Sequence, residues 1–178
     1  MIRDIQKIDD DIARKKRIIE HALYSDPDIV EVIDNKKIDP SCPEDLMWTN
    51  IFPFIRVPDS QDETKNFICF TIDDAGRTPG NQVMKTQYVQ FAIFVHKDLV
   101  ATNYGMARHD VLGYLVRDIF NLSNMLGPQM ELVSNKEGIT DESYITRTLK
   151  FELIDDNSTK PNRTNPYEYG RIMGHNRG

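Results

Sequence analysis

The sequence predicts an α/β (α+β) fold, with a mainly antiparallel sheet of four to five strands covered by a long helix, N-terminal helices and an extended C-terminal arm. Hydrophobic residues recur every three or four positions over residues 4–24 and 103–123, which is the period of amphipathic helices. Over the intervening and following segments the period changes to two, as in β-strands. From residue 155 onward the only aliphatic side chains are Ile172 and Met173, so this arm cannot form a core of its own.

The N-terminal region predicts helices. Residues 4–24 carry isoleucine and leucine among charged residues, which favours one helix with an apolar face. Pro27 stands near the start of the next apolar run, which predicts a second short helix over residues 25–33. Residues 43–48 predict one more helical turn, which Ser41 could cap.

The middle of the chain predicts the sheet. The strands are expected at residues 51–58, 66–73, 83–97, 129–134 and 143–154. The first contains two prolines, so it is expected to be an edge strand or a bulged one. In the longest strand, the face expected to meet the core consists of Val89, Phe91, Ile93 and Val95.

The helix predicted over residues 103–123 is expected to cover this sheet. Its apolar stripe would meet the sheet through Leu112, Leu115 and Ile119. These elements divide the chain into a helical segment (residues 1–49), an α/β core domain (50–154) and the extended arm (155–178). The length of 178 residues fits one domain with such appendages.

Composition excludes several classes of function. The formal net charge of −6 argues against general affinity for duplex DNA or anionic membranes. The N-terminus has no secretory signal pattern, and no apolar run approaches the length of a membrane helix, so we expect synthesis in the cytoplasm and no membrane partner. Cys42 and Cys69 are too few for a disulfide framework and are expected to be buried thiols.

No pattern indicates a catalytic, cofactor or metal site, and we expect a protein that is not an enzyme. The four histidines lie in separate regions without the spacing of metal ligands. A catalytic interpretation would pair His96 or His109 with Asp98 or Asp110, but polar caps and strand ends explain these residues equally. Residues 9–11 are three consecutive aspartates, which a solvated helix start explains. Four basic residues could form a basic surface near Tyr88 and Tyr104, although scattered solvated charges are the simpler interpretation: Arg56, Lys97, Arg108 and Arg117.

The order of elements resembles that of the tail terminator (tail completion) proteins of long-tailed bacteriophages. Residues 51–58 resemble their entry strand, residues 89–99 followed by 108–115 resemble their strand, linker and helix unit, and residues 144–153 resemble their closing strand. The resemblance covers residues 50–154. It implies a structural virion protein of the neck or tail without a cofactor, forming a homo-oligomeric, hexameric ring that terminates the tail tube.

The partners implied by this resemblance are the tail tube protein and the head-connector proteins, with DNA passing through the ring without specific binding. A related head-tail connector or stopper protein is the alternative. A small α/β enzyme or ligand-binding protein, with His96, Asp98 and His109 near one end of the sheet, is a further alternative, and a peptide-binding adaptor a third.

Two segments acquire a role under this interpretation. Acidic loops could line the lumen of the ring and repel DNA phosphates, through Asp59, Asp62, Glu63, Asp73 and Asp74. The arm could bind a neighbouring subunit or adjoining ring through Tyr167, Tyr169, Arg171, Ile172 and Met173. A solubilising end without a partner is the alternative for the arm.

Overall fold

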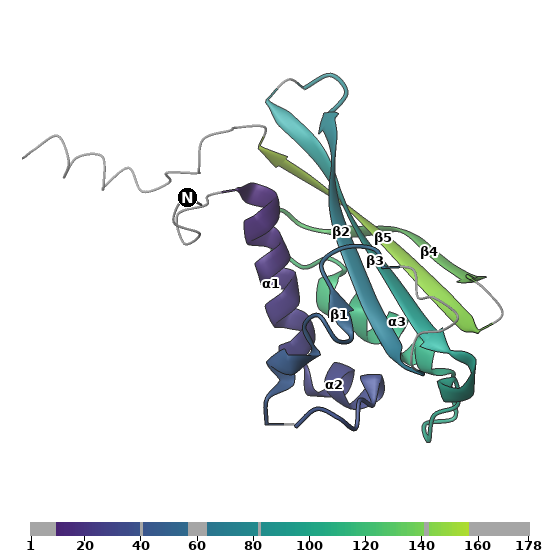
Figure 1. The fold of residues 1–178 in the computed structure, drawn as a ribbon. Helices are drawn as coiled ribbons and strands as arrows, with labels where there is room; N and C mark the ends of the chain where they lie inside the picture. The colour runs from purple at the N-terminus through teal and green to yellow at the C-terminus, as the bar shows by residue number, and fades with distance from the viewer. Residues whose placement is uncertain (1–9, 40, 57–63, 82, 141–142, 157–178) are drawn as a thin grey trace, which may run out of the picture.

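The computed structural model describes residues 10–39, 41–56, 64–81, 83–140 and 143–156, and its architecture is α+β. Within these residues, three α-helices and five strands follow one another as α1, α2, β1, β2, β3, α3, β4 and β5 (Figure 1). The bounds are α1 Asp11–Ser25, α2 Pro27–Ile33, β1 Ile51–Phe52, β2 Asn66–Arg77, β3 Met84–His96, α3 Arg108–Phe120, β4 Glu131–Ile139 and β5 Tyr144–Asp156, with 3₁₀ helices η2 Pro43–Leu46 and η3 Lys97–Leu99. None of the described helices is long and apolar enough to cross a membrane.

The strands form one mixed sheet in the order β1-β2-β3-β5-β4. β2 is antiparallel to β3, β3 to β5 and β5 to β4, whereas β1 runs parallel to β2. The expectation of a mainly antiparallel sheet is therefore corrected. β1 and β2 are separated by 13 residues, a length sufficient for the crossover connection that parallel pairing requires. β1 lies at an edge, as its prolines predict, and it ends directly before Pro53.

No long helix covers the sheet, and this expectation is wrong. α3 has 13 residues in place of the 21 expected over residues 103–123. The backbone turns at Gly105, with φ +74°, and an isolated bridge joins Ala101 to Ala107, so the helix starts only at Arg108. At the other end, Asn121 is extended and Leu122 is left-handed, which stops the helix.

One face of the sheet forms the main core together with α1, α2 and α3. The four residues predicted to form the core face of β3 are all buried here: Val89, Phe91, Ile93 and Val95. α3 contributes Leu112 as predicted, but its other fully buried residues are Val116 and Phe120, while Leu115 and Ile119 pack at the margin. The apolar stripe of α3 is therefore rotated relative to the predicted contact.

The opposite face of the sheet carries a second, smaller cluster. Its buried members are Phe52, Phe67, Cys69, Ala92, Phe94 and Tyr144, which come from β1, β2, β3 and β5. Burial raises the pKa of the Cys69 thiol to about 11. Cys69 is buried as predicted, whereas Cys42 is only half-buried.

The β2–β3 hairpin is longer than the sequence predicts, and Figure 1 shows it projecting beyond the helices. Asp73 was expected at the end of a strand and Asp74 in the loop after it, but both lie within β2, which continues to Arg77 past an irregularity between Asp74 and Arg77. Gly76, with φ +86°, allows this irregularity, since few other residues adopt such a conformation.

Local signals explain the helix starts. Asp10 caps α1 by accepting a hydrogen bond from the Ala13 amide (2.8 Å). Asp26 caps α2 by accepting from the Asp28 and Ile29 amides, and Pro27 follows at the first helical position. The expected cap Ser41 does not cap η2, because Cys42 occupies the cap position without a side-chain hydrogen bond.

A buried lysine of α1 forms hydrogen bonds with residues of the sheet. Lys15 is fully buried, and its ammonium donates to Asp11 Oδ2 (2.9 Å), Gln87 Oε1 (2.5 Å) and the Asp155 carboxylate. Asp11 is therefore not a solvated residue of the helix start. Partial burial alone would raise the pKa of Asp11, but the hydrogen bonds from Lys15 and Arg14 hold it well below its usual range.

Candidate functional site

Among the described residues, Trp48 has the largest exposed fraction of any aromatic side chain. It follows η2 in a left-handed backbone conformation, with φ +64°, and 65% of it is exposed. Such a conformation is strained for a bulky residue, and strain of this kind clusters at functional sites. Phe54 (44% exposed) lies beside it with a ring-centroid distance of 6.2 Å, and Ile55 is also exposed. We refer to Trp48, Phe54 and Ile55 as the Trp48 surface.

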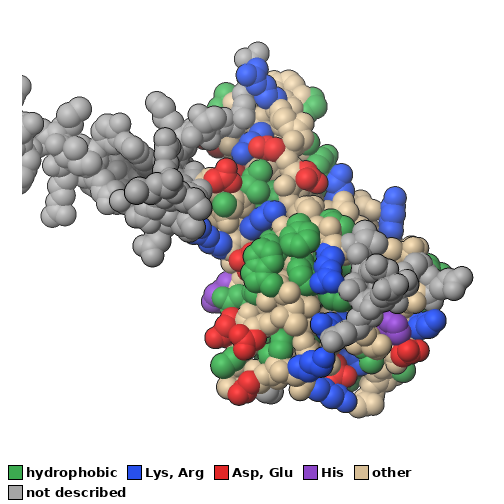
Figure 2. All heavy atoms as spheres, viewed as in Figure 1, with side chains coloured by type: hydrophobic (Ala, Val, Ile, Leu, Met, Phe, Trp, Pro, Cys, Tyr) green, Lys and Arg blue, Asp and Glu red, His purple; other side chains and the backbone are tan. Residues whose placement is uncertain are grey.

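The Trp48 surface continues into the small cluster of the sheet as a row of aromatic rings. Phe54 contacts Phe52 (5.7 Å between centroids), Phe52 contacts Phe67 (5.9 Å), and Phe67 contacts Tyr144 (6.0 Å). Figure 2 shows hydrophobic side chains gathered near the middle of one face of the molecule, beside lysine and arginine side chains. Exposed aromatic residues backed by packed ones are typical of protein-binding surfaces.

The turn that carries Trp48 is held rigidly. The Trp48 amide donates to the Ile51 carbonyl (2.9 Å). Two residues later, the buried Asn50 side chain donates to the Asn66 carbonyl (2.8 Å) and accepts from Asn35 (2.6 Å). The side chain of Asn66 in turn donates to the Ile33 carbonyl at the end of α2 (2.9 Å). The Trp48 surface is thus fixed to both the sheet and the helices.

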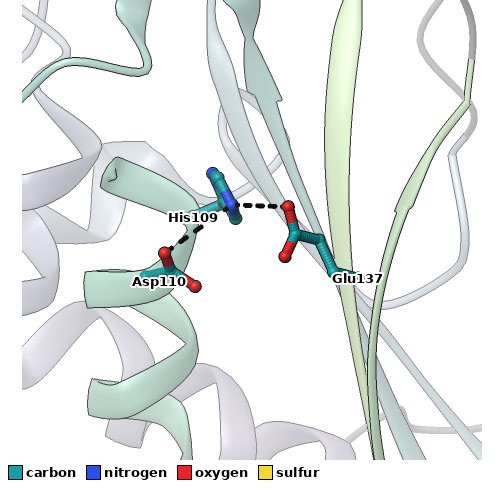
Figure 3. A group of neighbouring side chains, drawn as sticks. All are labelled: His109, Asp110 and Glu137. Carbon is teal, nitrogen blue, oxygen red and sulfur yellow. Dashed lines mark ion pairs between the residues drawn. The ribbon is translucent and has the colours of Figure 1, made fainter. Parts of the chain in front are cut away.

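A second group of side chains lies between α3 and β4. His109 Nε2 lies 3.3 Å from Glu137 Oε1 and 3.9 Å from Asp110 Oδ2 (Figure 3). His109 is 4% exposed, and its Nδ1 atom is buried without a partner among the described residues. The three donor atoms all lie within 4.8 Å of one another, so they could share a metal ion. We call these three residues the histidine-carboxylate cluster.

Arg147 of β5 positions one carboxylate of this cluster. Its guanidinium contacts Asp110 Oδ1, and its Nε donates to Asn135 Oδ1 (3.0 Å). Gly113 makes room for it, because a Cβ atom there would lie 2.6 Å from Arg147 Cδ. Asp110 Oδ2 remains directed toward His109.

In the structure, each of the two histidines considered in the sequence lies beside its aspartate, but the two pairs lie in different places. His96 Nδ1 accepts from the Asp98 amide (3.3 Å) and lies 3.5 Å from its carboxylate. The His96 ring contacts Tyr144 in the small cluster, whereas His109 extends from α3 on the other face of the sheet. The two pairs therefore do not form one site. Glu137 escaped prediction because nothing in the sequence relates it to His109.

The residues of the postulated basic surface are dispersed. Arg108 is buried and donates to the Leu99 carbonyl (2.7 Å) and the Val32 carbonyl, so it ties α3 to α2. Arg56 stacks over Phe52 (5.1 Å to the centroid), and Arg117 over Tyr114 (5.7 Å). Tyr88 contacts Lys150, and Tyr104 contacts Glu31.

Most residues expected in the lumen loops and the arm lie outside the described residues. These are Asp59, Asp62 and Glu63 of the first loop, and Tyr167, Tyr169, Arg171, Ile172 and Met173 of the arm. Asp73 and Asp74 are described and exposed, and Asp74 Oδ2 lies 3.3 Å from Lys85 Nζ.

Comparison with known proteins places the chain in a family. Its sequence matches the YomW family over residues 26–153. The chain belongs to the YomW family. YomW is a protein of the SPBc2 phage type, so the match associates the chain with a bacteriophage. The matched region contains both the Trp48 surface and the histidine-carboxylate cluster, but it excludes Lys15. No curated protein matches the sequence.

Proposed function

We propose that this member of the YomW family is a structural subunit of a phage neck or tail, and that it binds a neighbouring copy through the Trp48 surface. The ring it would form terminates the tail tube and meets the head connector; a head-tail connector or stopper ring is the alternative position. Membership of a phage family supports a role in a bacteriophage, and the exposed, strained Trp48 is the observation that carries the proposal.

The energetics of Trp48 favour a binding role. Its backbone conformation costs on the order of 1–3 kcal/mol, yet its side chain remains 65% exposed, so packing within the subunit offsets little of this strain. Tryptophan is the residue type most enriched among those that dominate binding energy. Burial of Trp48 and Phe54 against a partner would supply the missing compensation.

The sheet supports head-to-tail assembly. Its two edges are unlike: β1 pairs with only part of β2, and β4 forms the other edge within the described residues. Contacts between unlike surfaces of identical subunits generate rings when the rotation closes. A ring formed in this way requires no cofactor.

The lumen assignment remains part of this proposal, with one change. Asp74 is paired with Lys85, so its charge would repel phosphate less than a free carboxylate. Asp73, together with Asp59, Asp62 and Glu63, is the proposed source of the repulsion. The arm residues 157–178 are proposed to bind the same neighbouring copy or an adjoining ring.

Size-exclusion chromatography with light scattering over a range of protein concentrations tests the proposal. We expect a discrete oligomer for the unaltered protein and a monomer for Trp48→Ala, since loss of a binding tryptophan costs about 2 kcal/mol or more. Tyr114→Ala is the matched control, because Tyr114 is a similarly exposed aromatic residue (51%) on α3. At a protein concentration at which the unaltered protein is monomeric, both variants should keep its melting temperature. A monomer at every concentration for the unaltered protein, or equal assembly of Trp48→Ala, would refute the proposal.

A further inference from the structure

We propose that His109, Asp110 and Glu137 bind a divalent transition-metal ion, namely zinc. The site would lie between the start of α3 and the edge strand β4 (Figure 3). This inference is independent of the proposed ring function.

The distances fit zinc coordination. With metal-ligand distances of about 2.0–2.2 Å, two ligand atoms of a tetrahedral zinc site lie about 3.4 Å apart. His109 Nε2 and Glu137 Oε1 are separated by 3.3 Å, and His109 Nε2 and Asp110 Oδ2 by 3.9 Å. The side chains of Glu137 and Asp110 are 64% and 42% exposed, so both carboxylates have room to close on an ion.

The buried histidine is the second observation that points to a ligand. His109 is more than nine-tenths buried and directs Nε2 toward the two carboxylates, 3.3 Å from Glu137 Oε1, while its Nδ1 is buried without a partner among the described residues. Nε2 and the two carboxylates that face it can each offer a lone pair to the same ion. A metal ion at Nε2 would satisfy that nitrogen and both carboxylates together.

The surroundings of the cluster suit a cation. Two carboxylates and the Arg147 guanidinium leave a net charge of about −1 beside a neutral imidazole, which favours a divalent ion. Arg147 binds Asp110 Oδ1 and leaves Oδ2 for the ion, in the way that outer groups orient metal ligands elsewhere. A ligand set of one imidazole and two carboxylates favours zinc or a similar transition metal over magnesium or calcium. The three protein ligands leave the fourth position for water.

Bound zinc would fasten the edge of the sheet. β4 pairs only with β5 among the described strands, and its outer side has no strand partner there. An ion shared by α3 and Glu137 would add a link between this strand and the helix layer.

The test is isothermal titration of untagged, chelator-treated protein with zinc chloride, supported by the visible absorption of cobalt(II) as a tetrahedral probe. We expect one zinc per chain, a higher melting temperature with zinc, and the absorption typical of tetrahedral cobalt(II). Glu137→Gln should weaken zinc binding by at least about tenfold and abolish the zinc-dependent rise in melting temperature. Because Glu137 is largely exposed, this variant should fold normally.

Glu131→Gln is the matched control, since Glu131 is an exposed residue of the same strand outside the cluster. It should bind zinc as the unaltered protein does, whereas zinc bound by His21 or His175 elsewhere in the chain would persist in Glu137→Gln. His109→Asn should abolish the cobalt absorption. Absence of zinc binding by the unaltered protein at tens of micromolar, or a loss smaller than tenfold in Glu137→Gln, would overturn the proposal.

Discussion

Lys15→Met tests whether the buried ammonium stabilises the fold. Methionine matches the length of the lysine stem and stays apolar, so the change removes the charge and the three hydrogen bonds that Lys15 donates. Asp11 keeps its contacts with Arg14 (2.9 Å) and Lys85 (3.3 Å), but Asp155 loses the cation it contacts. The main cost is therefore an uncompensated Asp155 carboxylate and an unsatisfied Gln87 oxygen.

The size of the effect follows from burial. Removing one partner of a fully buried ion pair costs about 3–5 kcal/mol. The side chains of Asp11 and Asp155 are 29% and 23% exposed, so water relieves part of this penalty, and we expect a loss of about 2–4 kcal/mol. For a chain of this size, that loss lowers the melting temperature by roughly 4–16 °C.

The pH dependence supplies an independent check. The pKa of Asp11 is lower in the folded protein than its ordinary value of 3.8, so its ionised form stabilises the fold above that pH. This stabilisation is lost as the pH falls below about 4 toward the folded pKa. The difference between the unaltered protein and Lys15→Met should therefore be constant from about pH 5 to 8 and shrink in more acidic solution.

Urea unfolding at several pH values measures both effects, with Lys136→Met as an exposed lysine control that should change the free energy of unfolding by less than about 0.5 kcal/mol. A Lys15→Met variant as stable as the control at pH 7 would refute the reasoning. A difference that stays constant down to pH 2 would refute the role assigned to Asp11.

Three further predictions address the core, the thiols and the arm. Val116→Asp should lower stability by about 3–5 kcal/mol in thermal unfolding, whereas Leu115→Asp should cost markedly less because Leu115 lies at the margin; equal costs would contradict the observed rotation of α3. In the folded protein, a thiol reagent at pH 8 should modify Cys42 much faster than Cys69, whose pKa of about 11 and burial suppress the thiolate; equal rates would contradict the packing of the small cluster. Truncation after Asp156 should leave the melting temperature of the monomer unchanged and reduce assembly in light scattering, while normal assembly would eliminate the proposed role of the arm.

The truncation that tests the arm must be placed after the observed end of strand β5. Sequence reasoning divides the chain after residue 154, where aliphatic side chains become rare. The structure continues β5 to Asp156, and Asp155 binds Lys15. A truncation after residue 154 would therefore remove a structural ion pair together with the arm and confuse the two effects.

Periodicity predicted those parts of the fold in which one side of an element is buried. The alternation in β3 identified its core face correctly, because that pattern is repeated over the whole strand. The length of α3 could not be predicted in the same way, since Met106 continues the apolar pattern but lies exposed in a turn before the helix. The parallel pairing of β1 depends on the path of a connection, which local pattern does not encode.

The candidate sites depended on contacts across the sequence. Glu137 and His109 are brought together only by the packing of α3 against the β4–β5 edge. Lys15 gave a signal that could have been recognised, because it lies on the apolar stripe of α1 between Ile12 and Ile19. A lysine in that stripe requires acceptors from the sheet, and Gln87 and Asp155 supply them.

The two faces of the sheet have different physical requirements. The helix-covered face buries its side chains within the subunit, so its sequence is constrained by internal packing and by the buried contacts of Lys15. On the other face, the aromatic row ends in Trp48 and Phe54, which the subunit leaves largely exposed on a turn fixed by Asn50. A rigid turn lowers the entropy lost when these rings bind a partner, because their positions are set before contact. The strain at Trp48 and the rigidity of its turn therefore both support the proposal that another protein binds this face.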